Sequence, residues 1–204
     1  MNERKLLLYS SLFLAIISLL VIQIKEPPKR FSLNVENQFS YGNPNASVHM
    51  ILLEEFACPL CSLFHKETLP IIDKNYVDTG RVKVTIVPLA FLDDSLSSCN
   101  LSLCMQKLAP SLMKPFYDFI FTQETLTSPR NLLSLYKEKE SSLPSTQILQ
   151  CLRKSSFDDT IEQNLALAKQ IYPGDLHVPI VLINGKLIPN ADSKTLSKAI
   201  DEVM

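Results

Sequence analysis

The chain has 204 residues, of which 46% are hydrophobic and 20% charged, a composition typical of a globular protein. Its 20 Lys and Arg residues balance 21 Asp and Glu residues, so no excess of basic charge indicates a nucleic-acid partner. With only 4 Gly residues and no glycine-rich spacing, the sequence also excludes a phosphate-binding loop for nucleotides.

The first predicted element is an uncharged apolar run from Leu6 to Ile24. As a helix, this run is long enough to cross a hydrocarbon core of ~30 Å. Because no small-residue cleavage site follows it, we predict that residues 1–24 form an uncleaved membrane anchor, with a cleaved signal peptide or a buried core helix as the alternatives. Basic residues on both sides leave its orientation open. Residues 25–34, which include Pro27-Pro28, are expected to form a stiff linker.

The body of the chain opens with a predicted strand–strand–helix–strand order. A short strand is expected near residues 38–41, and an apolar run over 48–53 predicts a strand buried on both faces. Apolar residues at helical spacing over about 59–77, ended by Gly80, predict a helix. The alternating, β-branched segment 81–89 predicts the next strand. The helix is long enough to connect two parallel strands.

The pattern then changes to helices. Residues 93–172 have helical periodicity and almost no strand signal, which predicts an all-helical insertion. Strand signals return over 178–183 and 186–188, joined by the hairpin dipeptide Asn184-Gly185. Ser193 is expected to cap a terminal helix. The order predicts an α/β fold interrupted by a helical insertion.

The most informative motif is Cys58-Pro59-Leu60-Cys61, placed where a buried strand ends and a helix begins. With Pro59 at the first helical position, Cys58 falls at the N-cap, beside unpaired backbone N–H groups. These donors and the helix dipole favour a thiolate over a thiol and lower its pKa. We therefore predict that Cys58 forms the mixed disulfide with a substrate and that Cys61 resolves it.

Three other interpretations of these cysteines compete with a redox-active dithiol. They are a structural disulfide within the motif, which strains a four-residue loop, a zinc site completed by Cys99 and Cys104, and a cytosolic redox motif. The zinc site needs a better second half than the four-residue spacing of Cys99 and Cys104. The apolar N-terminal run disfavours a cytosolic site, so a dithiol outside the cytoplasm is preferred.

Pro179 interrupts the strand-like run HVPIVLI, so it is expected at a strand start or edge. The sequence alone leaves the isomer of its peptide bond open. His65 is interpreted as a surface residue on the helix, with a position facing Cys61 as the alternative. His177 is expected either to line a substrate groove or to be an ordinary loop residue. The aromatic cluster over 116–121 is interpreted as core rather than as a peptide groove.

An apolar strand running into CPLC, a helical insertion and then VPIVLINGK resembles the DsbA-like thiol:disulfide oxidoreductases of the thioredoxin superfamily, over roughly residues 35–204. The resemblance implies a thioredoxin-like fold with a cis Pro179 beside the reactive sulfur. It implies that the backbone at Val178 pairs with a substrate peptide, and Val178 itself resembles the oxidase branch. It also implies a second disulfide between Cys104 and Cys151, which leaves Cys99 free.

The sequence departs from this family at two positions. Leu60 stands where the oxidases it resembles have a histidine that helps to hold the thiolate, so a weaker oxidant is expected. Leu52 stands where family members commonly have a buried acid. Glu55 matches another acidic family position, and either Glu55 or Glu54 is a candidate for proton transfer, with a solvated acid at a strand end as the equal alternative.

Together these features predict a membrane-tethered, periplasmic protein disulfide oxidoreductase that oxidises cysteine pairs of exported proteins. The resemblance implies reoxidation by a quinone-coupled membrane partner of the DsbB or VKOR kind, and no metal or organic cofactor is expected. A reductase or isomerase that uses the same dithiol is the nearest alternative. A non-catalytic zinc-binding or structural surface module is the alternative of another class.

Overall fold

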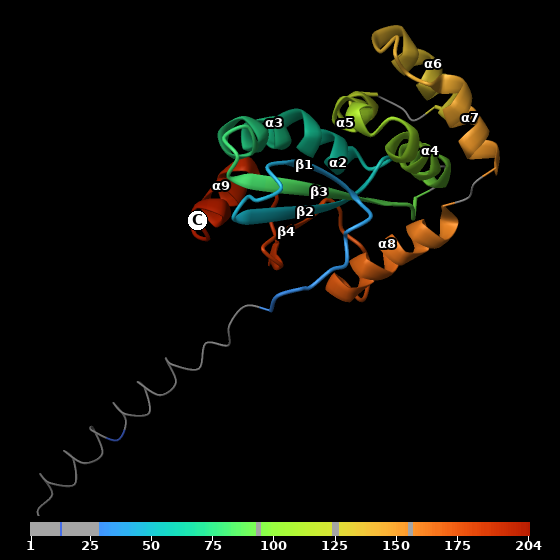
Figure 1. Ribbon diagram of the computed structural model, residues 1–204. Helices are drawn as coiled ribbons and strands as arrows, with labels where there is room; N and C mark the ends of the chain where they lie inside the picture. Colours follow the sequence, from blue (N-terminus) through green and yellow to red (C-terminus); the bar gives the residue numbers. More distant parts are fainter. Residues whose placement is uncertain (1–12, 14–28, 93–94, 124–126, 155–156) are drawn as a thin grey trace, which may run out of the picture.

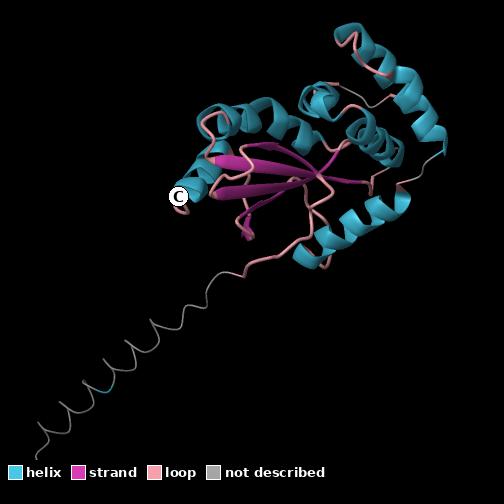
Figure 2. Ribbon diagram, in the orientation of Figure 1, coloured by secondary structure: helices cyan, strands magenta, loops and turns pink. Residues whose placement is uncertain are grey.

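The computed structural model describes residues 13, 29–92, 95–123, 127–154 and 157–204 (Figure 1). At its centre lies a five-stranded sheet with the order β1-β3-β2-β4-β5, in which β2 and β3 are parallel and all other neighbours antiparallel (Figure 2). The strands are β1 (Phe39–Gly42), β2 (Val48–Glu55), β3 (Val82–Leu89), β4 (Ile180–Ile183) and β5 (Lys186–Ile188).

The central strand β2 is longer than the sequence predicts. Its apolar residues are buried on both faces, as expected for a strand with neighbours on both sides and helices above and below. The strand continues through Glu54 and Glu55, which pair in register with Pro88 and Leu89 of β3. In the sequence, two adjacent acids indicate the end of a strand. In the structure, the pairing of β2 with β3 continues through both acids and buries them in the core.

The connection from β2 to β3 is one helical path with two π-helical turns. It consists of α2 (Pro59–Leu63), η1 (Phe64–Thr68), α3 (Leu69–Ile72) and η2 (Asp73–Val77). Pro70 has no N–H to donate to the carbonyl of Lys66, and the Leu69 N–H is bonded to the Phe64 carbonyl instead, five residues back. The single predicted helix over 59–77 is therefore present, with its hydrogen-bond register changed twice.

The helical insertion follows β3 and matches the predicted region. It contains α4 (Ser95–Leu108), η3 (Pro110–Leu112), α5 (Met113–Ile120), α6 (Pro129–Lys139), α7 (Ser145–Lys154) and α8 (Asp158–Ile171). A disulfide joins Cys104 of α4 to Cys151 of α7. Figure 1 shows α6 and α7 at the far end from α9, and α8 across the sheet from α2 and α3. The aromatic residues of α5 are buried, so their interpretation as core is confirmed.

The chain ends with the β4–β5 hairpin and α9 (Ser193–Asp201). Asn184 and Gly185 both have positive φ, 46° and 79°, as a two-residue hairpin turn requires. The predicted cap of α9, Ser193, is wrong by one residue. Asp192 is the N-cap, and its carboxylate accepts from the Thr195 N–H at 2.9 Å. A carboxylate accepts more strongly than a hydroxyl beside the positive end of a helix, which favours Asp192.

The segment before β1 lies against the β4–β5 hairpin. Arg30 forms an antiparallel bridge with Lys186, and the Phe31 N–H donates to the Gly185 carbonyl at 2.8 Å. A Cβ at Gly185 would lie 2.6 Å from the Phe31 carbonyl oxygen, so this approach requires glycine. The predicted membrane anchor, apart from residue 13, lies outside the described residues. Among the residues described, no helix combines the length and apolar character needed to span a membrane.

Candidate dithiol active site

The two cysteines of the CPLC motif lie at the start of α2, directly after β2. Cys58 is the N-cap residue, with extended backbone angles, and Pro59 begins the helix. The Ser62 N–H donates to the Cys58 carbonyl at 3.1 Å, which closes the first turn. Both Cys58 and Cys61 are free thiols. Cys58 is half-buried and Cys61 is fully buried, so substrates can reach the first sulfur and not the second.

The environment gives the two thiols opposite acidities. A hydrogen bond from the Cys61 side chain, opposed by burial and supported by the backbone N–H groups of Cys61 and Leu60, lowers the pKa of Cys58 to about 6. Burial, followed by the same hydrogen bond and by the Glu54 carboxylate, raises the pKa of Cys61 far above its ordinary value. At neutral pH Cys58 is therefore a thiolate and Cys61 a thiol, the arrangement expected of a helix N-terminus.

The loop before β4 closes over Cys58 from the other side. The Val178–Pro179 peptide bond is cis, and the Val178 carbonyl oxygen lies 3.7 Å from the Cys58 sulfur. Pro179 directly precedes β4, which begins at Ile180, so the predicted position at a strand start is confirmed. The structure thus brings Cys58, Val178 and Pro179 together, as the resemblance implied.

A groove of about 400 Å³ extends from this loop along α2 and β5. Leu60 and Leu63 of α2 line it and are 62% and 48% exposed. His177 lines it as well, in the loop before Pro179, so this histidine is both a loop residue and part of the groove wall. The remaining lining residues are mostly apolar and include Phe64, Tyr172, Ile180, Leu187 and Ile188. An extended peptide with apolar side chains suits such a groove.

A buried hydrogen-bonded pair of polar side chains lies next to the dithiol. Glu54, 1% exposed, receives a hydrogen bond from Nε2 of His65 at 2.8 Å, and the His65 ring stacks on Phe121 with 4.0 Å between centroids. The interpretation of His65 as a surface residue is therefore wrong. The extension of β2 buries Glu54, and the His65 side chain is buried beside it as its hydrogen-bond partner. A sequence signal existed: Glu54 shares one strand face with Met50 and Leu52, and an acid on such an apolar face needs a buried partner.

Glu55 is also fully buried, so the interpretation of either acid as solvated is wrong. The Ala57 N–H donates to one Glu55 oxygen at 3.1 Å. Burial raises the pKa of Glu55, a rise that the Ser95 side chain and the Ala57 N–H oppose and that the nearby Cys58 sulfur supports. Leu52, at the position where the family has an acid, is completely buried in β2. Two buried carboxyl groups at the end of β2 thus accompany the dithiol.

The other three cysteines lie apart from the CPLC motif. Cys99 is buried, and its thiol donates to the Leu89 carbonyl at 3.0 Å. Cys104 is bonded to Cys151, so the zinc site that would combine it with Cys58, Cys61 and Cys99 is not formed. Across the described ranges, no group of three or more His, Cys, Asp or Glu residues is arranged to hold a metal ion.

The chain is similar to known proteins over most of its length. The family model described as Thioredoxin matches residues 34–202. A probable disulfide bond formation protein D of Bacillus cereus is 27% identical over 172 residues, which cover 81% of this chain and 78% of that protein. A putative protein-disulfide oxidoreductase of Rickettsia prowazekii is 24% identical over 177 residues, which cover 83% of this chain and 62% of the relative.

Two solved structures share the fold. Oxidised BdbD from Bacillus subtilis superimposes with a TM-score of 0.76 at 22% identity, over 87% of this chain and 98% of that one. DsbA of Chlamydia trachomatis superimposes with a TM-score of 0.75 at 23% identity, over 87% of this chain and 97% of that one.

Proposed function

The chain belongs to the thioredoxin family, and from this premise we propose that it is a thiol:disulfide oxidoreductase that oxidises cysteine pairs of exported proteins through Cys58 and Cys61. The observation that carries the proposal is the opposite acidity of the two thiols. Cys58 has a pKa of about 6 and partial exposure, whereas Cys61 is buried and has a raised pKa. The names of the relatives, disulfide bond formation protein D among them, support the same activity.

The proposed cycle begins with a Cys58–Cys61 disulfide. A substrate thiolate attacks the Cys58 sulfur, the Cys58–Cys61 bond breaks, and Cys61 leaves and takes up a proton. A second substrate thiolate then attacks the substrate sulfur of the mixed disulfide and releases Cys58. The substrate pair loses two electrons and becomes a disulfide, and the enzyme becomes a dithiol. The low pKa of Cys58 makes it the better leaving group in the second step.

The cis-proline loop supplies a place for the substrate chain. The carbonyl of Val178 faces the Cys58 sulfur, and the groove beside it is mostly apolar, with Glu67 and Asp192 among its lining residues. An extended peptide that pairs with this backbone as an added strand would bring a cysteine to Cys58. Glu54 and Glu55, buried at the end of β2, are the candidates for exchanging the Cys61 proton.

We also propose that residues 1–24 anchor the protein in the bacterial inner membrane with its body in the periplasm. The disulfide between Cys104 and Cys151 supports an oxidising compartment, where such bonds persist. Each turnover leaves the dithiol reduced, so the cycle needs an electron acceptor. A quinone-coupled membrane protein of the DsbB or VKOR kind is the proposed one.

Leu60 favours a second candidate, a reductase or isomerase with the same dithiol. Its side chain is exposed beside Cys58 and has no hydrogen-bond donor for the thiolate. Less stabilisation of the reduced form means a lower reduction potential.

The reduction potential of the Cys58–Cys61 pair tests both candidates. The full chain in detergent is equilibrated with glutathione buffers, and free thiols are trapped with a mass-tagged alkylating agent. A potential near about −120 mV would support an oxidase, and one near about −270 mV would indicate a reductase. A variant with Cys58→Ser controls for signal from the other cysteines. Bound zinc, or a pair that dithiothreitol cannot reduce, would contradict both candidates.

A further inference from the structure

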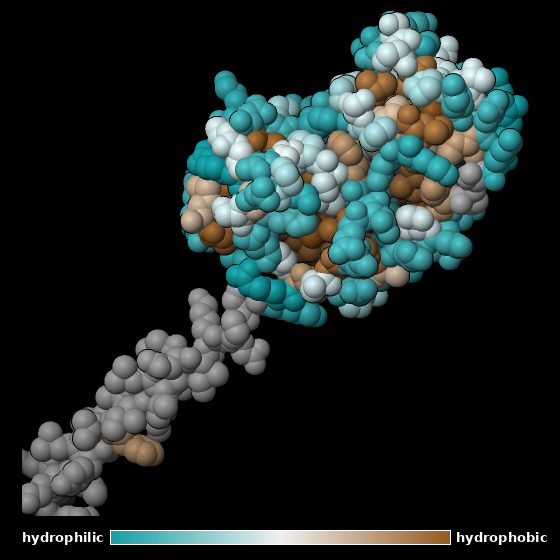
Figure 3. Space-filling view, viewed as in Figure 1, coloured by the Kyte–Doolittle hydropathy of each residue, from teal (hydrophilic) through white to brown (hydrophobic). Residues whose placement is uncertain are grey.

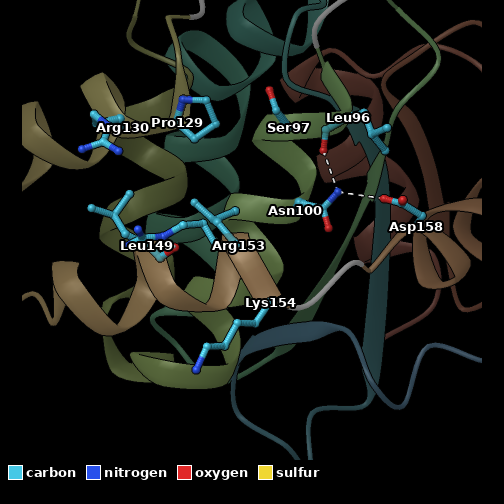
Figure 4. Close-up of a pocket in the computed structure, with 10 residues that line it drawn as sticks. Leu96, Ser97, Asn100, Pro129, Arg130, Leu149, Arg153, Lys154 and Asp158 are labelled. Carbon is cyan, nitrogen blue, oxygen red and sulfur yellow. Dashed lines mark hydrogen bonds between the residues drawn. The ribbon is translucent and has the colours of Figure 1, made fainter.

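A second cavity lies in the helical insertion, away from the groove of the dithiol. It has a volume of about 820 Å³ and is formed by α4, α6, α7 and the start of α8 (Figure 4). Figure 4 shows Arg130 of α6 and Leu149, Arg153 and Lys154 of α7 across from Leu96 and Asn100 of α4. None of these residues takes part in the cycle proposed for Cys58 and Cys61.

The cavity carries a local excess of positive charge. Arg130, Arg153 and Lys154 line it, and all three are exposed. Within the described part of the chain, no ion pair joins any of them to a carboxylate. The one acid in the lining, Asp158, accepts a hydrogen bond from Asn100 at 3.0 Å. Since the whole chain has a net charge of −1, this basic cluster is a local feature and not a reflection of composition.

The same cavity has an apolar floor. Leu96 lines it and is 48% exposed, and Leu149 and Leu152 are half-buried. Figure 3 shows apolar side chains exposed among hydrophilic ones over the insertion helices. A ligand that satisfies both features has carboxylates and apolar side chains close together.

Bonds connect three of the four helices that form the cavity. Asn100 donates to the Leu96 carbonyl and to Asp158, and its side-chain oxygen accepts from the Phe157 N–H at 2.8 Å. These bonds hold the start of α8 against α4. The disulfide between Cys104 and Cys151 joins α4 to α7. A cavity with connected walls binds without a large ordering cost.

The cavity lies near the end of the sheet that carries the dithiol. The carboxyl ends of the parallel strands β2 and β3 meet at one edge, with Glu55 opposite Leu89. Cys58 follows the first strand, and Leu96 lies in the first turn of the helix that follows the second. Phe91 and Leu92, between β3 and α4, are exposed apolar residues at this edge. The start of α4, which lines the cavity through Leu96, and the dithiol therefore lie at the same edge of the sheet, where Ser95 interacts with Glu55.

We propose that this cavity binds an acidic, leucine-rich segment of the polypeptide whose cysteines exchange with Cys58. The proposal deepens the proposed function, on which it rests, because it names the class of substrate. It assigns recognition to a surface separate from the groove beside Pro179. Clients with such a segment would then be oxidised in preference to clients without one.

The test measures binding of cysteine-free peptides to the full chain, so that it does not depend on redox activity. The probe is a fluorescent peptide of alternating Glu and Leu residues, and its counterpart has Lys in place of Glu. In a variant with Arg130→Glu, Arg153→Glu and Lys154→Glu, we expect the Kd of the acidic peptide to rise about tenfold, since three favourable charge contacts become repulsive. The control variant, K74E/K107E/K169E, has the same net charge and reverses exposed lysines elsewhere. It should keep the Kd within about twofold.

Several results would overturn the proposal. One is an equal loss of peptide binding in the cavity variant and the control variant. Another is equal binding of the acidic and basic peptides by the unmodified chain. A third is binding of phosphatidylglycerol vesicles by a chain that does not bind the acidic peptide. Self-association that the cavity variant abolishes would indicate a second copy as the occupant. The potential of the Cys58–Cys61 pair should be the same in the cavity variant and the control. If the Cys58–Cys61 pair had the reduction potential of a reductase and the acidic peptide still bound, the proposed oxidase activity would be wrong and the assignment of the cavity would remain supported.

Discussion

At the scale of single residues, the chemistry depends on one hydrogen bond between two cysteines. The Cys61 thiol is the main cause of the low pKa of Cys58, ahead of the backbone N–H groups of the helix start. Burial at the same time keeps Cys61 protonated, so the donor remains available over the range in which Cys58 ionises. The motif therefore provides both the nucleophile and the group that stabilises it.

This dependence predicts a pH profile. Because the thiolate reacts and the thiol does not, alkylation of reduced Cys58 by iodoacetamide should rise with pH, with a midpoint at about 6. In a Cys61→Ala variant the midpoint should move up by about one pH unit or more, since a charge-assisted hydrogen bond is lost. The matched control is Cys61→Ser, which keeps a donor and should titrate near the original midpoint. Equal midpoints in all three proteins would contradict the assignment.

Leu60 gives a second prediction. A histidine at this exposed position can donate to the Cys58 thiolate, so Leu60→His should raise the reduction potential by roughly 20–30 mV, since 30 mV corresponds to ~1.4 kcal/mol. Leu63→His is the control, because that side chain is also exposed on α2 but lies beyond Cys61. Glutathione equilibration measures both variants. A change of equal size in the two would show that the effect is not a contact with Cys58.

The buried pair of Glu54 and His65 predicts an effect on stability. His65→Leu leaves the Glu54 carboxyl without its partner in the core, which should lower the free energy of unfolding by about 3–5 kcal/mol. The double variant, with Glu54→Leu as well, should recover much of that loss, because two buried polar groups are removed together. Urea unfolding at pH 7 measures the set. Additive losses in the double variant would mean that the two side chains are not coupled.

The residues of the site differed in how far the sequence predicted them. The order of strand, CPLC and helix was sufficient to place Cys58 at an N-cap, and the run HVPIVLI was sufficient to place Pro179 before a strand. The burial of Glu54 and His65 was missed because it depends on how far β2 extends beside β3, a contact between distant segments. Periodicity in the sequence carries no information on that length.

At the scale of elements, the predicted order of strands and helices is confirmed, and two of the differences have local causes. The first π-helical turn, η1, ends beside Pro70, which has no backbone N–H to donate. The structure shows no comparable cause for the second turn, η2. The cap of α9 moves to Asp192 because two adjacent residues can both serve and the carboxylate accepts more strongly. A sequence pattern does not determine which of two neighbouring residues serves as the cap.

The link between α4 and α7 gives a prediction at this scale. The Cys104–Cys151 disulfide closes a loop with a sequence separation of 47. The variant with Cys104→Ala and Cys151→Ala should therefore be less stable by about 2–4 kcal/mol in urea unfolding. The pH midpoint of Cys58 alkylation should not change, because the main causes of the low pKa of Cys58 lie in the CPLC motif itself. A shifted midpoint would connect the insertion to the dithiol in a way that the structure does not contain.

At the scale of the whole molecule, the proposed anchor is open to a direct test. In a bacterial host, the full chain should remain in the membrane pellet after carbonate extraction, with the intact mass of residues 1–204, since the run from Leu6 to Ile24 has the length and apolar character that a membrane-spanning helix needs. A soluble product with a new N-terminus near residue 25 would show a cleaved signal peptide. The two outcomes leave the chemistry of Cys58 unchanged.

The contact of Phe31 with Gly185 has a consequence for the reach of the enzyme. The Asn184-Gly185 turn lies beside His49 at the start of β2, whereas Cys58 follows the other end of that strand, roughly 25 Å away. A chain anchored through residues 1–24 therefore enters the domain at one pole and presents its reactive sulfur at the other. In that arrangement, soluble clients would meet an outward-facing sulfur. A partner embedded in the same bilayer would reach the sulfur only after the domain turned relative to the membrane, so this reorientation would separate the oxidation of a client from the reoxidation of the dithiol.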